Sequence, residues 1–251
     1  MTKELEIWWN EVSKGYQEDS DLHTKSALYG PFCPDEDKLK LLGNLKGKKI
    51  LEVGCGGAQC SIAFAKKGAI CTGLDISKNQ LDYAEKIVKK NKVKVKLIKK
   101  DIQTLSGIKS NSFDIVFSAY ALLYVPNLKK CFKEINRVLK TGGIFVFSHD
   151  SPFFLTLDAK TKKIVRSYLR TGKQEEIDFG PDGSKHKFVF YNRKLSEIYN
   201  SLVETGFFVK KILEPYYPKQ KAWSRKSWRE IYPPEFVKLM PPTIIFKAVK
   251  I

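Results

Sequence analysis

Short apolar segments alternate with amphipathic helical patterns from residue 48 to residue 150, and this alternation most constrains the fold. Each apolar segment has the length and the β-branched or aromatic content of a buried strand. Strands that alternate with helices pair in parallel and carry helices on both faces, so the pattern predicts an α/β fold built on a mostly parallel sheet. The segments are KKILEV (48–53), AICTGLD (69–75), VKLIKK (95–100), FDIVFS (113–118) and GIFVFSH (143–149).

Three helices are expected between these strands. The first covers residues 58–67. The second runs to about residue 91 and begins after Ser77, which can form a capping box with Gln80. The third is capped by Asn127, and Gly142–Gly143 is expected to end it. Its apolar side chains recur at helical spacing, at Leu128, Cys131, Phe132, Ile135, Val138 and Leu139.

Further elements are expected on both sides of this core. Residues 3–17 predict an amphipathic helix, and a short helical stretch is expected at Lys38–Leu42. A helix at 193–205 precedes two final strands, at 207–213 and 243–249. The apolar side chains expected to face inward from the two longer helices are Leu5, Trp8, Trp9, Val12, Tyr16, Leu195, Ile198, Tyr199, Leu202 and Val203.

Two segments interrupt the alternation and are interpreted as insertions over the active site. Residues 150–192 contain Gly180-Pro181-Asp182-Gly183, a turn signal that predicts a hairpin. Residues 214–242 are rich in Tyr, Trp and Pro. Ligands bind at the carboxyl edge of open α/β sheets, so we expect both insertions and a helical cap at 1–47 to cover that edge. The prediction is one domain of 251 residues with its core at 48–149.

The composition excludes several classes of protein. The chain is 43% hydrophobic and 29% charged, which suffices for a packed core. Its longest nearly unbroken apolar run, Phe117–Val125, is shorter than the roughly 20 residues that span a bilayer. No signal peptide is recognised, the five cysteines form no CxxC pair, and the three histidines show no zinc spacing. We therefore expect a soluble, cytoplasmic protein with reduced thiols and no bound metal.

The formal net charge of +18 admits two interpretations. One is a polyanionic partner such as RNA or DNA, and the other is a general enrichment in lysine. The chain has 39 lysines and only six arginines, although the planar fork of arginine is preferred for phosphate and base contacts. The densest basic run, Lys86–Lys100, is also expected to lie mostly away from the active site. A nucleic-acid partner is therefore the less favoured alternative.

A glycine-rich turn follows the first strand. Gly54 and Gly56 lie between that strand and a helix N-terminus, where backbone N–H groups and the helix dipole favour an anionic group. Asp75 ends the next strand 21 residues after Gly54, where a carboxylate can accept hydrogen bonds from ribose hydroxyls. The alternative is a tight turn with a helix-capping aspartate. The dinucleotide fingerprint GxGxxG is excluded, because Gln59 stands where its third glycine is required.

At these residues the chain resembles the class I S-adenosylmethionine-dependent methyltransferases. The resemblance implies a Rossmann-like, doubly wound sheet of seven strands, mostly parallel with the last strand antiparallel, and S-adenosylmethionine as the cofactor. Glu214-Pro215 and PPTIIFKAVK (241–250) resemble the small-molecule, ubiquinone-biosynthesis-like (type 11) branch of that family. The motifs that carry the family resemblance are ILEVGCGGAQ (50–59), GLDIS (73–77), KKDIQTL (99–105), SFDIVFSAYALLYV (112–125) and RVLKTGGIFVFS (137–148).

The resemblance also implies roles for individual residues at the cofactor. Glu52 would organise the glycine turn or reach the methionine amine, Asp75 would hold the ribose, and Asp101 would accept from the adenine amino group. Tyr16 and Gln80 have structural alternatives, as a core residue and as a helix cap respectively. The expected cofactor-binding residues are Tyr16, Glu52, Gly54, Cys55, Gly56, Gln59, Asp75, Ile76, Gln80, Asp101, Ile102 and Ser118.

Two residues at strand ends are candidates for the catalytic base. His149 follows the fifth strand and has an unperturbed pKa near neutrality, and Tyr120 follows the fourth. Tyr124 and His186 are weaker candidates. The fourth strand is followed by Ala119-Tyr120-Ala121 and not by the Asn/Asp-Pro-Pro-Tyr/Phe signature of enzymes that methylate adenine, cytosine or glutamine.

The leading hypothesis is a methyltransferase that acts on a small organic acceptor by in-line displacement. An aromatic-rich cap suits a closed pocket for such a molecule. An RNA or protein methyltransferase is the first alternative, favoured by the net charge. A protein that binds S-adenosylmethionine without catalysis is the second.

Overall fold

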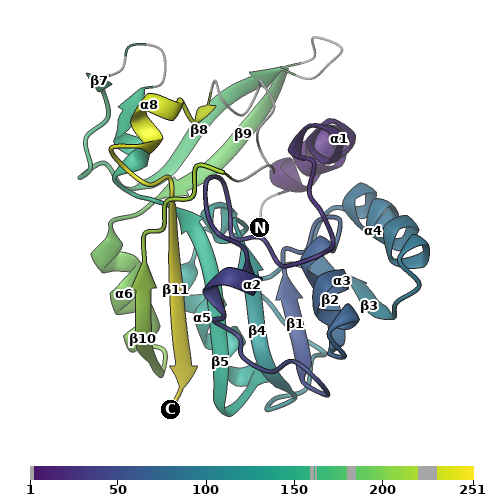
Figure 1. Ribbon diagram of the computed structural model, residues 1–251. Helices are drawn as coiled ribbons and strands as arrows, with labels where there is room; N and C mark the ends of the chain where they lie inside the picture. Colours follow the sequence, from purple (N-terminus) through teal and green to yellow (C-terminus); the bar gives the residue numbers. More distant parts are fainter. Residues whose placement is uncertain (1–2, 159–160, 162, 180–184, 220–230) are drawn as a thin grey trace.

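The central sheet has the predicted α/β architecture. The computed structural model describes residues 3–158, 161, 163–179, 185–219 and 231–251. Its central sheet contains seven strands in the order β10-β11-β5-β4-β1-β2-β3 (Figure 1). Their bounds are β1 Lys49–Val53, β2 Ile70–Asp75, β3 Val95–Lys99, β4 Phe113–Ala119, β5 Leu139–Asp150, β10 Phe207–Leu213 and β11 Thr243–Lys250.

Strand direction confirms the expected doubly wound sheet with an antiparallel last strand. The pairs β1–β2, β2–β3, β1–β4 and β4–β5 are all parallel. The last strand, β11, pairs antiparallel with both β5 and β10. From β1 the chain continues to β2 and β3 on one side and then to β4 and β5 on the other, so the strand order reverses between β1 and β4, which is where such sheets open a crevice for ligands.

Apolar side chains on the two faces of the sheet form separate cores. On one face, α5 (Leu128–Val138) and α6 (Leu195–Val203) contribute Phe132 and Leu202, which pack against Phe145 and Phe147. On the other, α3 (Gln59–Lys66) and the segment around α2 (Glu36–Leu39) cover a second core that includes Phe117. Helix α4 (Lys78–Lys90) packs against the edge strand β3 and its neighbour β2.

Two antiparallel hairpins and a long first helix lie beyond the carboxyl ends of the strands (Figure 1). Helix α1 spans Lys3–Ser20 and contacts both α4 and β9. The larger hairpin joins β8 (Gly172–Phe179) to β9 (Lys185–Asn192), as expected for the first insertion. Its predicted Gly180–Gly183 turn lies outside the described residues. The remaining elements are η1 Leu122–Tyr124, η2 Phe154–Thr156, β6 Leu157–Asp158, β7 Lys163–Ile164 and α8 Pro234–Val237.

Several local predictions were wrong. Helix α5 ends at Val138, and Leu139 already pairs with Phe113 in the sheet, so Gly142–Gly143 lies inside β5 and does not end the helix. On α6, Tyr199 and Val203 are 41% and 48% exposed, because only the Ile198–Leu202 side of the helix meets the core. The short second helix also begins and ends earlier than expected, at Glu36–Leu39.

The capping box of α4 is only half formed. The Ser77 side chain accepts a hydrogen bond from the Gln80 backbone N–H, as predicted. The Gln80 side chain does not return to Ser77, because it accepts from the Gln17 amide on α1. The Asn127 cap of α5 is confirmed, since its side chain accepts from the Lys130 N–H. Among the described helices, none is both long enough and apolar enough to cross a membrane.

Candidate active site

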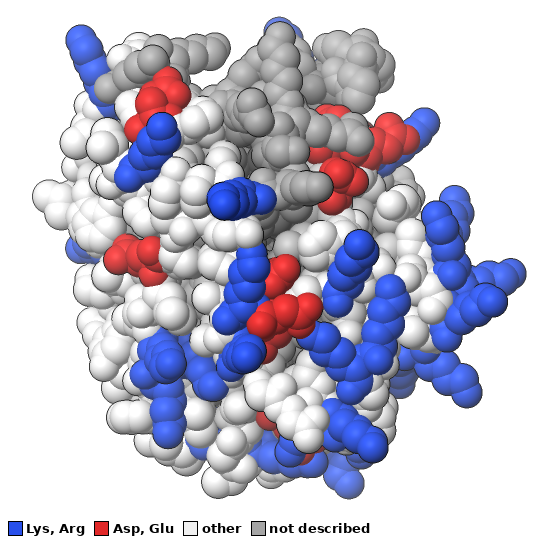
Figure 2. Space-filling model, viewed as in Figure 1, with Lys and Arg blue, Asp and Glu red and all other residues white. Residues whose placement is uncertain are grey.

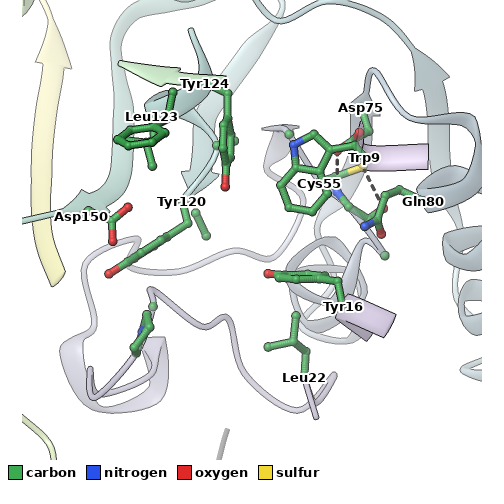
Figure 3. A pocket seen from close by; sticks show the side chains of 18 of the residues that line it. Trp9, Tyr16, Leu22, Cys55, Asp75, Gln80, Tyr120, Leu123, Tyr124 and Asp150 are labelled. Atoms are coloured by element: carbon green, nitrogen blue, oxygen red, sulfur yellow. Dashed lines mark hydrogen bonds between the residues drawn. The ribbon is translucent and has the colours of Figure 1, made fainter. Parts of the chain in front are cut away.

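A cavity of about 510 Å³ opens at the carboxyl ends of β1, β2, β4 and β5. Figure 3 shows Asp75, Cys55, Gln80 and Trp9 on one side of it and Asp150 and Tyr120 on the other, with the ring of Tyr16 extending from the first side toward the second. One cavity therefore has two ends, with the glycine turn at one end and the last residue of β5 at the other.

The glycine turn requires glycine at its first position. Gly54 has a φ of +69°, and a Cβ there would lie 2.2 Å from the Ala121 Cβ. Gly56 has a φ of +50°, but a Cβ at that position would have ordinary contacts. The turn therefore brings its backbone close to the β4–η1 loop at Gly54 and leaves space over Gly56, where a ligand group can approach the N-terminus of α3.

Glu52, just before the glycine turn, holds the start of helix α3 through its side chain. Its side chain is 3% exposed, and Oε2 accepts hydrogen bonds from both the backbone N–H and the hydroxyl of Ser61. Burial raises the pKa of Glu52 to about 7, although the Ser61 hydrogen bonds oppose the shift. The carboxyl group lines the cavity and fixes the first turn of α3 from below.

Asp75 links the end of β2 to the turn. Its Oδ2 accepts from the Gly56 N–H at 2.8 Å, and its Oδ1 accepts from the Ser77 N–H at 2.9 Å. Burial raises the pKa of this carboxyl group, and the backbone hydrogen bonds partly offset the rise. Asp75 thus holds the turn, as the structural alternative expects, but Ser77 and not Asp75 is the N-cap of α4. The Asp75 carboxyl group also lines the cavity.

Three glutamine side chains join α1 to the end of the cavity at the glycine turn. The Gln17 amide donates to Gln80 at 2.7 Å, and the Gln59 amide donates to the Gln17 carbonyl oxygen. All three side chains are buried, and all three line the cavity. The buried Gln80 Nε2 has no hydrogen-bond partner among the described residues, so it is a donor available to a ligand.

Aromatic rings from α1, η1 and β9 form the roof. The Trp9 ring meets Tyr16 and Tyr124 edge-on, with centroid distances of 5.3 and 5.4 Å. The Trp8 ring contacts Phe188 of the β8–β9 hairpin at 4.6 Å, and Tyr124 contacts the same ring at 5.8 Å. The first helix and the first insertion therefore close over the cavity together, as the sequence predicts for caps.

The other end of the cavity has a buried acid and two tyrosines. Asp150, at the last position of β5, is 6% exposed and accepts a hydrogen bond from the Tyr232 hydroxyl at 3.2 Å. Burial raises the pKa of Asp150 to about 7. The Tyr120 hydroxyl pairs with the Thr243 hydroxyl at 2.7 Å, and burial holds the pKa of Tyr120 well above its usual value.

The structure does not bring every predicted site residue to the cavity. His149 is 1% exposed, its Nδ1 bonds the Asp150 carbonyl oxygen at 2.8 Å, and burial lowers its pKa to about 4. Ser118 is buried, and its hydroxyl donates to the Val53 carbonyl oxygen. Asp101 is half-buried and accepts from the Gln103 N–H. None of these three lines the cavity, whereas Ile102 and Tyr120 do.

Strand alternation explains why Asp150 takes the place expected for His149. Side chains of Phe145 and Phe147 enter the core under α5, and His149 follows them on the same face. Asp150 falls on the opposite face and reaches the cavity. Both faces of β5 are buried, so its sequence shows no alternation of polar and apolar residues that could have identified the side that faces the cavity. Gln17 was also missed, although its helix was predicted.

Comparison with known proteins identifies the same core. A family model described as a methyltransferase domain matches residues 51–147. An uncharacterized protein of Haemophilus influenzae is 28% identical over 225 residues, which cover 85% of each chain. The ubiquinone biosynthesis O-methyltransferase of Coxiella burnetii is 36% identical over 141 residues, and this match spans only 56% of either chain.

Solved structures share the fold. A crystal structure of an S-adenosylmethionine dependent methyltransferase from Mesorhizobium loti superposes with a TM-score of 0.61 at 20% identity, covering 84% of this chain and 95% of that one. At such identity the likeness shows a common fold. The motifs, the sheet order and the family match together identify residues 51–147 as a class I S-adenosylmethionine-dependent methyltransferase domain.

Proposed function

We propose that this methyltransferase transfers its methyl group to a small organic acceptor held in the cavity. The observation that carries the proposal is an aromatic roof over a space of about 510 Å³, with the glycine turn at one end and Asp150 at the other. Ligand pockets of this size and lining suit small molecules. The curated O-methyltransferase relatives, by their name, belong to ubiquinone biosynthesis, which agrees with an acceptor of this class.

The residues at the glycine turn fit S-adenosylmethionine. The open space over Gly56, the unpartnered Gln80 Nε2 and the Asp75 carboxyl group offer the donors and acceptors that an amino-acid and ribose portion would need. We assign cofactor contacts to the predicted residues that line the cavity. These are Tyr16, Glu52, Gly54, Cys55, Gly56, Gln59, Asp75, Ile76, Gln80 and Ile102.

S-adenosylmethionine supplies a methyl group that a sulfonium has already activated. The residues of this chain then have two tasks, to align the acceptor and to exclude water. Correct alignment alone is worth roughly 7–11 kcal/mol of the barrier. The rings of Trp9, Tyr16 and Tyr124 keep water out, and their faces also favour a cation beneath them.

An RNA or protein methyltransferase remains the first alternative, because of the net charge of +18. Figure 2 shows lysine and arginine side chains spread over much of one face. Lys86, Lys89 and Lys90 end α4, at the amino edge of the sheet and opposite the cavity. Their position favours the small acceptor. A protein that binds cofactor without catalysis is the second alternative.

The chain is further proposed to act as one cytoplasmic domain. Its core at 48–149 holds the cofactor, and the N-terminal cap and both insertions cover the acceptor. All five cysteines are buried free thiols, which supports a reducing compartment.

A transfer assay with labelled S-adenosylmethionine tests the proposal. The protein is incubated with three fractions of one cell extract: small molecules, total RNA and protein. Label that enters the small-molecule fraction supports the proposal. Label that enters only RNA or protein supports the first alternative, and cofactor binding by calorimetry without any transfer supports the second.

A further inference from the structure

The charges that line the cavity have the opposite sign from the chain as a whole. The chain carries a formal net charge of +18, yet the described lining contains four carboxyl groups and one guanidinium. The carboxyl groups belong to Glu52, Asp75, Asp150 and Glu176. The guanidinium of Arg166 pairs with Glu176 at 2.8 Å, so these two charges compensate each other.

Of the remaining carboxyl groups, Asp150 has the fewest partners from the chain. Glu52 is held by Ser61, and Asp75 accepts two backbone N–H groups at the cofactor end. Asp150 accepts from the Tyr232 hydroxyl, and no Lys, Arg or His pairs with it among the described residues. Ionising a buried carboxyl group without a cation beside it is costly, so the place of Asp150 on a cavity wall points to a ligand that compensates its charge.

The surroundings of Asp150 favour a cation more than a neutral group. Tyr120 from the end of β4, Tyr124 from η1 and Tyr232 before α8 all feel the charge of Asp150, and burial holds the pKa of each well above its usual value. These three hydroxyls therefore stay neutral when Asp150 titrates. Their rings, together with Trp9 and Tyr16 in Figure 3, offer faces that attract an organic cation.

We propose that the acceptor is an amine that enters as an ammonium ion, and that Asp150 binds this ammonium and takes its proton. The inference rests on the proposed function, because the amine would lie in the same cavity, facing the cofactor end. A proton passes from R–NH3⁺ to the Asp150 carboxylate, which leaves R–NH2 with a free lone pair. That lone pair forms the new N–CH3 bond while the S–CH3 bond of the methyl donor breaks and its electron pair stays on sulfur. The Asp150 carboxyl group returns its proton to solvent.

Calorimetry with matched ring probes tests the inference. The protein is first saturated with S-adenosylhomocysteine and then titrated with 2-phenylethylamine, 2-phenylethanol or phenylacetate. We expect the amine to bind at least tenfold more tightly than the alcohol, and the carboxylate to bind more weakly than either. Asp150→Asn should remove the preference for the amine and leave the alcohol affinity within about twofold. Asp82→Asn, on the outer face of α4, is the matched control and should keep the preference.

A pH series adds a readout that a structural role for Asp150 would not move. The Tyr232 hydrogen bond lowers the pKa of Asp150, so in Tyr232→Phe the rise of amine affinity with pH should shift to higher pH. Equal affinity for amine and alcohol, no binding of the amine, or an Asp150→Asn variant that still prefers the amine would each overturn the inference. If S-adenosylhomocysteine itself fails to bind in the first step, it is the proposed function that fails.

Discussion

His149 offers a sharp test of the electrostatics beneath the cavity. The buried ring is neutral, and its Nδ1 must carry the hydrogen, because the Asp150 carbonyl oxygen that it contacts can only accept. Its Nε2 has no partner among the described residues, so a second proton would have to be held in an apolar core. We expect His149→Gln, which can still donate to that carbonyl but cannot titrate, to fold and to be more resistant to acid than the wild type.

The size of the effect follows from the pKa. Burial lowers the pKa of His149 from 6.5 to about 4, so well above pH 6.5 the ring is neutral in both states and costs almost nothing. Between pH 6.5 and pH 4 His149 is protonated in the unfolded chain but not in the folded protein, so stability falls as pH is lowered toward 4. Relative to the glutamine variant, the wild type should lose about 0.2 kcal/mol at pH 7, about 1.4 at pH 5.5 and about 2.6 at pH 4.5.

Urea unfolding of both proteins at these three pH values measures the difference. Glu52 and Asp150 have raised pKa values of about 7, so their effect on the free energy of unfolding is opposite to that of His149. They stabilise the folded protein at low pH, and this stabilisation is lost as pH rises toward 7. Both proteins contain these two residues, so that contribution largely cancels in the comparison. Two stability curves that run parallel from pH 7 to pH 4.5 would refute the reasoning. Cofactor binding at pH 7 should be unchanged, because His149 does not line the cavity.

Three further variants test the cofactor end. Asp75→Ala should weaken S-adenosylmethionine binding by about 1.5–3 kcal/mol in calorimetry, since the ligand loses a charged acceptor, and wild-type affinity in a folded variant would refute that role. Gly54→Ala should be far more destabilising in thermal unfolding than Gly43→Ala, because both have a positive φ but only the first places its Cβ against Ala121; equal losses would contradict this. Gln17→Ala should weaken cofactor binding several-fold while the exposed Lys14→Ala does not, and equal affinities would show that the glutamine link between α1 and the turn is unimportant.

The fold could be predicted from the sequence because its signals are local and repeated. Five apolar strands, the caps at Ser77 and Asn127 and the long amphipathic pattern of α5 each specify an element within one window of residues. Predictions from local sequence were wrong at the boundary between α5 and β5, where the helix passes directly into the strand without a turn. Leu139 suits the buried side of a helix and of a strand equally well, so the start of β5 could not be distinguished from the end of α5.

The sequence predicted the end of the cavity at the glycine turn and did not predict the end at Asp150. The turn at Gly54 and the carboxyl group of Asp75 lie at strand ends, and the motifs specify both. Asp150 and Tyr232 meet only because chain segments about 80 residues apart fold onto the same cavity wall. Side chains alternate between the two faces of β5, and this alternation decides whether His149 or Asp150 reaches the cavity. Because β5 is buried on both faces, its sequence does not reveal which residues lie on which face.

The net charge of the chain is a poor guide to its acceptor, because the charge acts over a short range. The lysines at the end of α4 lie at the amino edge of the sheet, and the cavity lies at the carboxyl edge. A five-residue strand separates these edges by roughly 17 Å, about twice the Debye length at physiological salt. The field of these exposed lysines is therefore largely screened at the acceptor, whereas the buried Asp150 acts there through a medium with little water. A polyanion could bind to this outer surface and still be a poor partner for the acidic cavity.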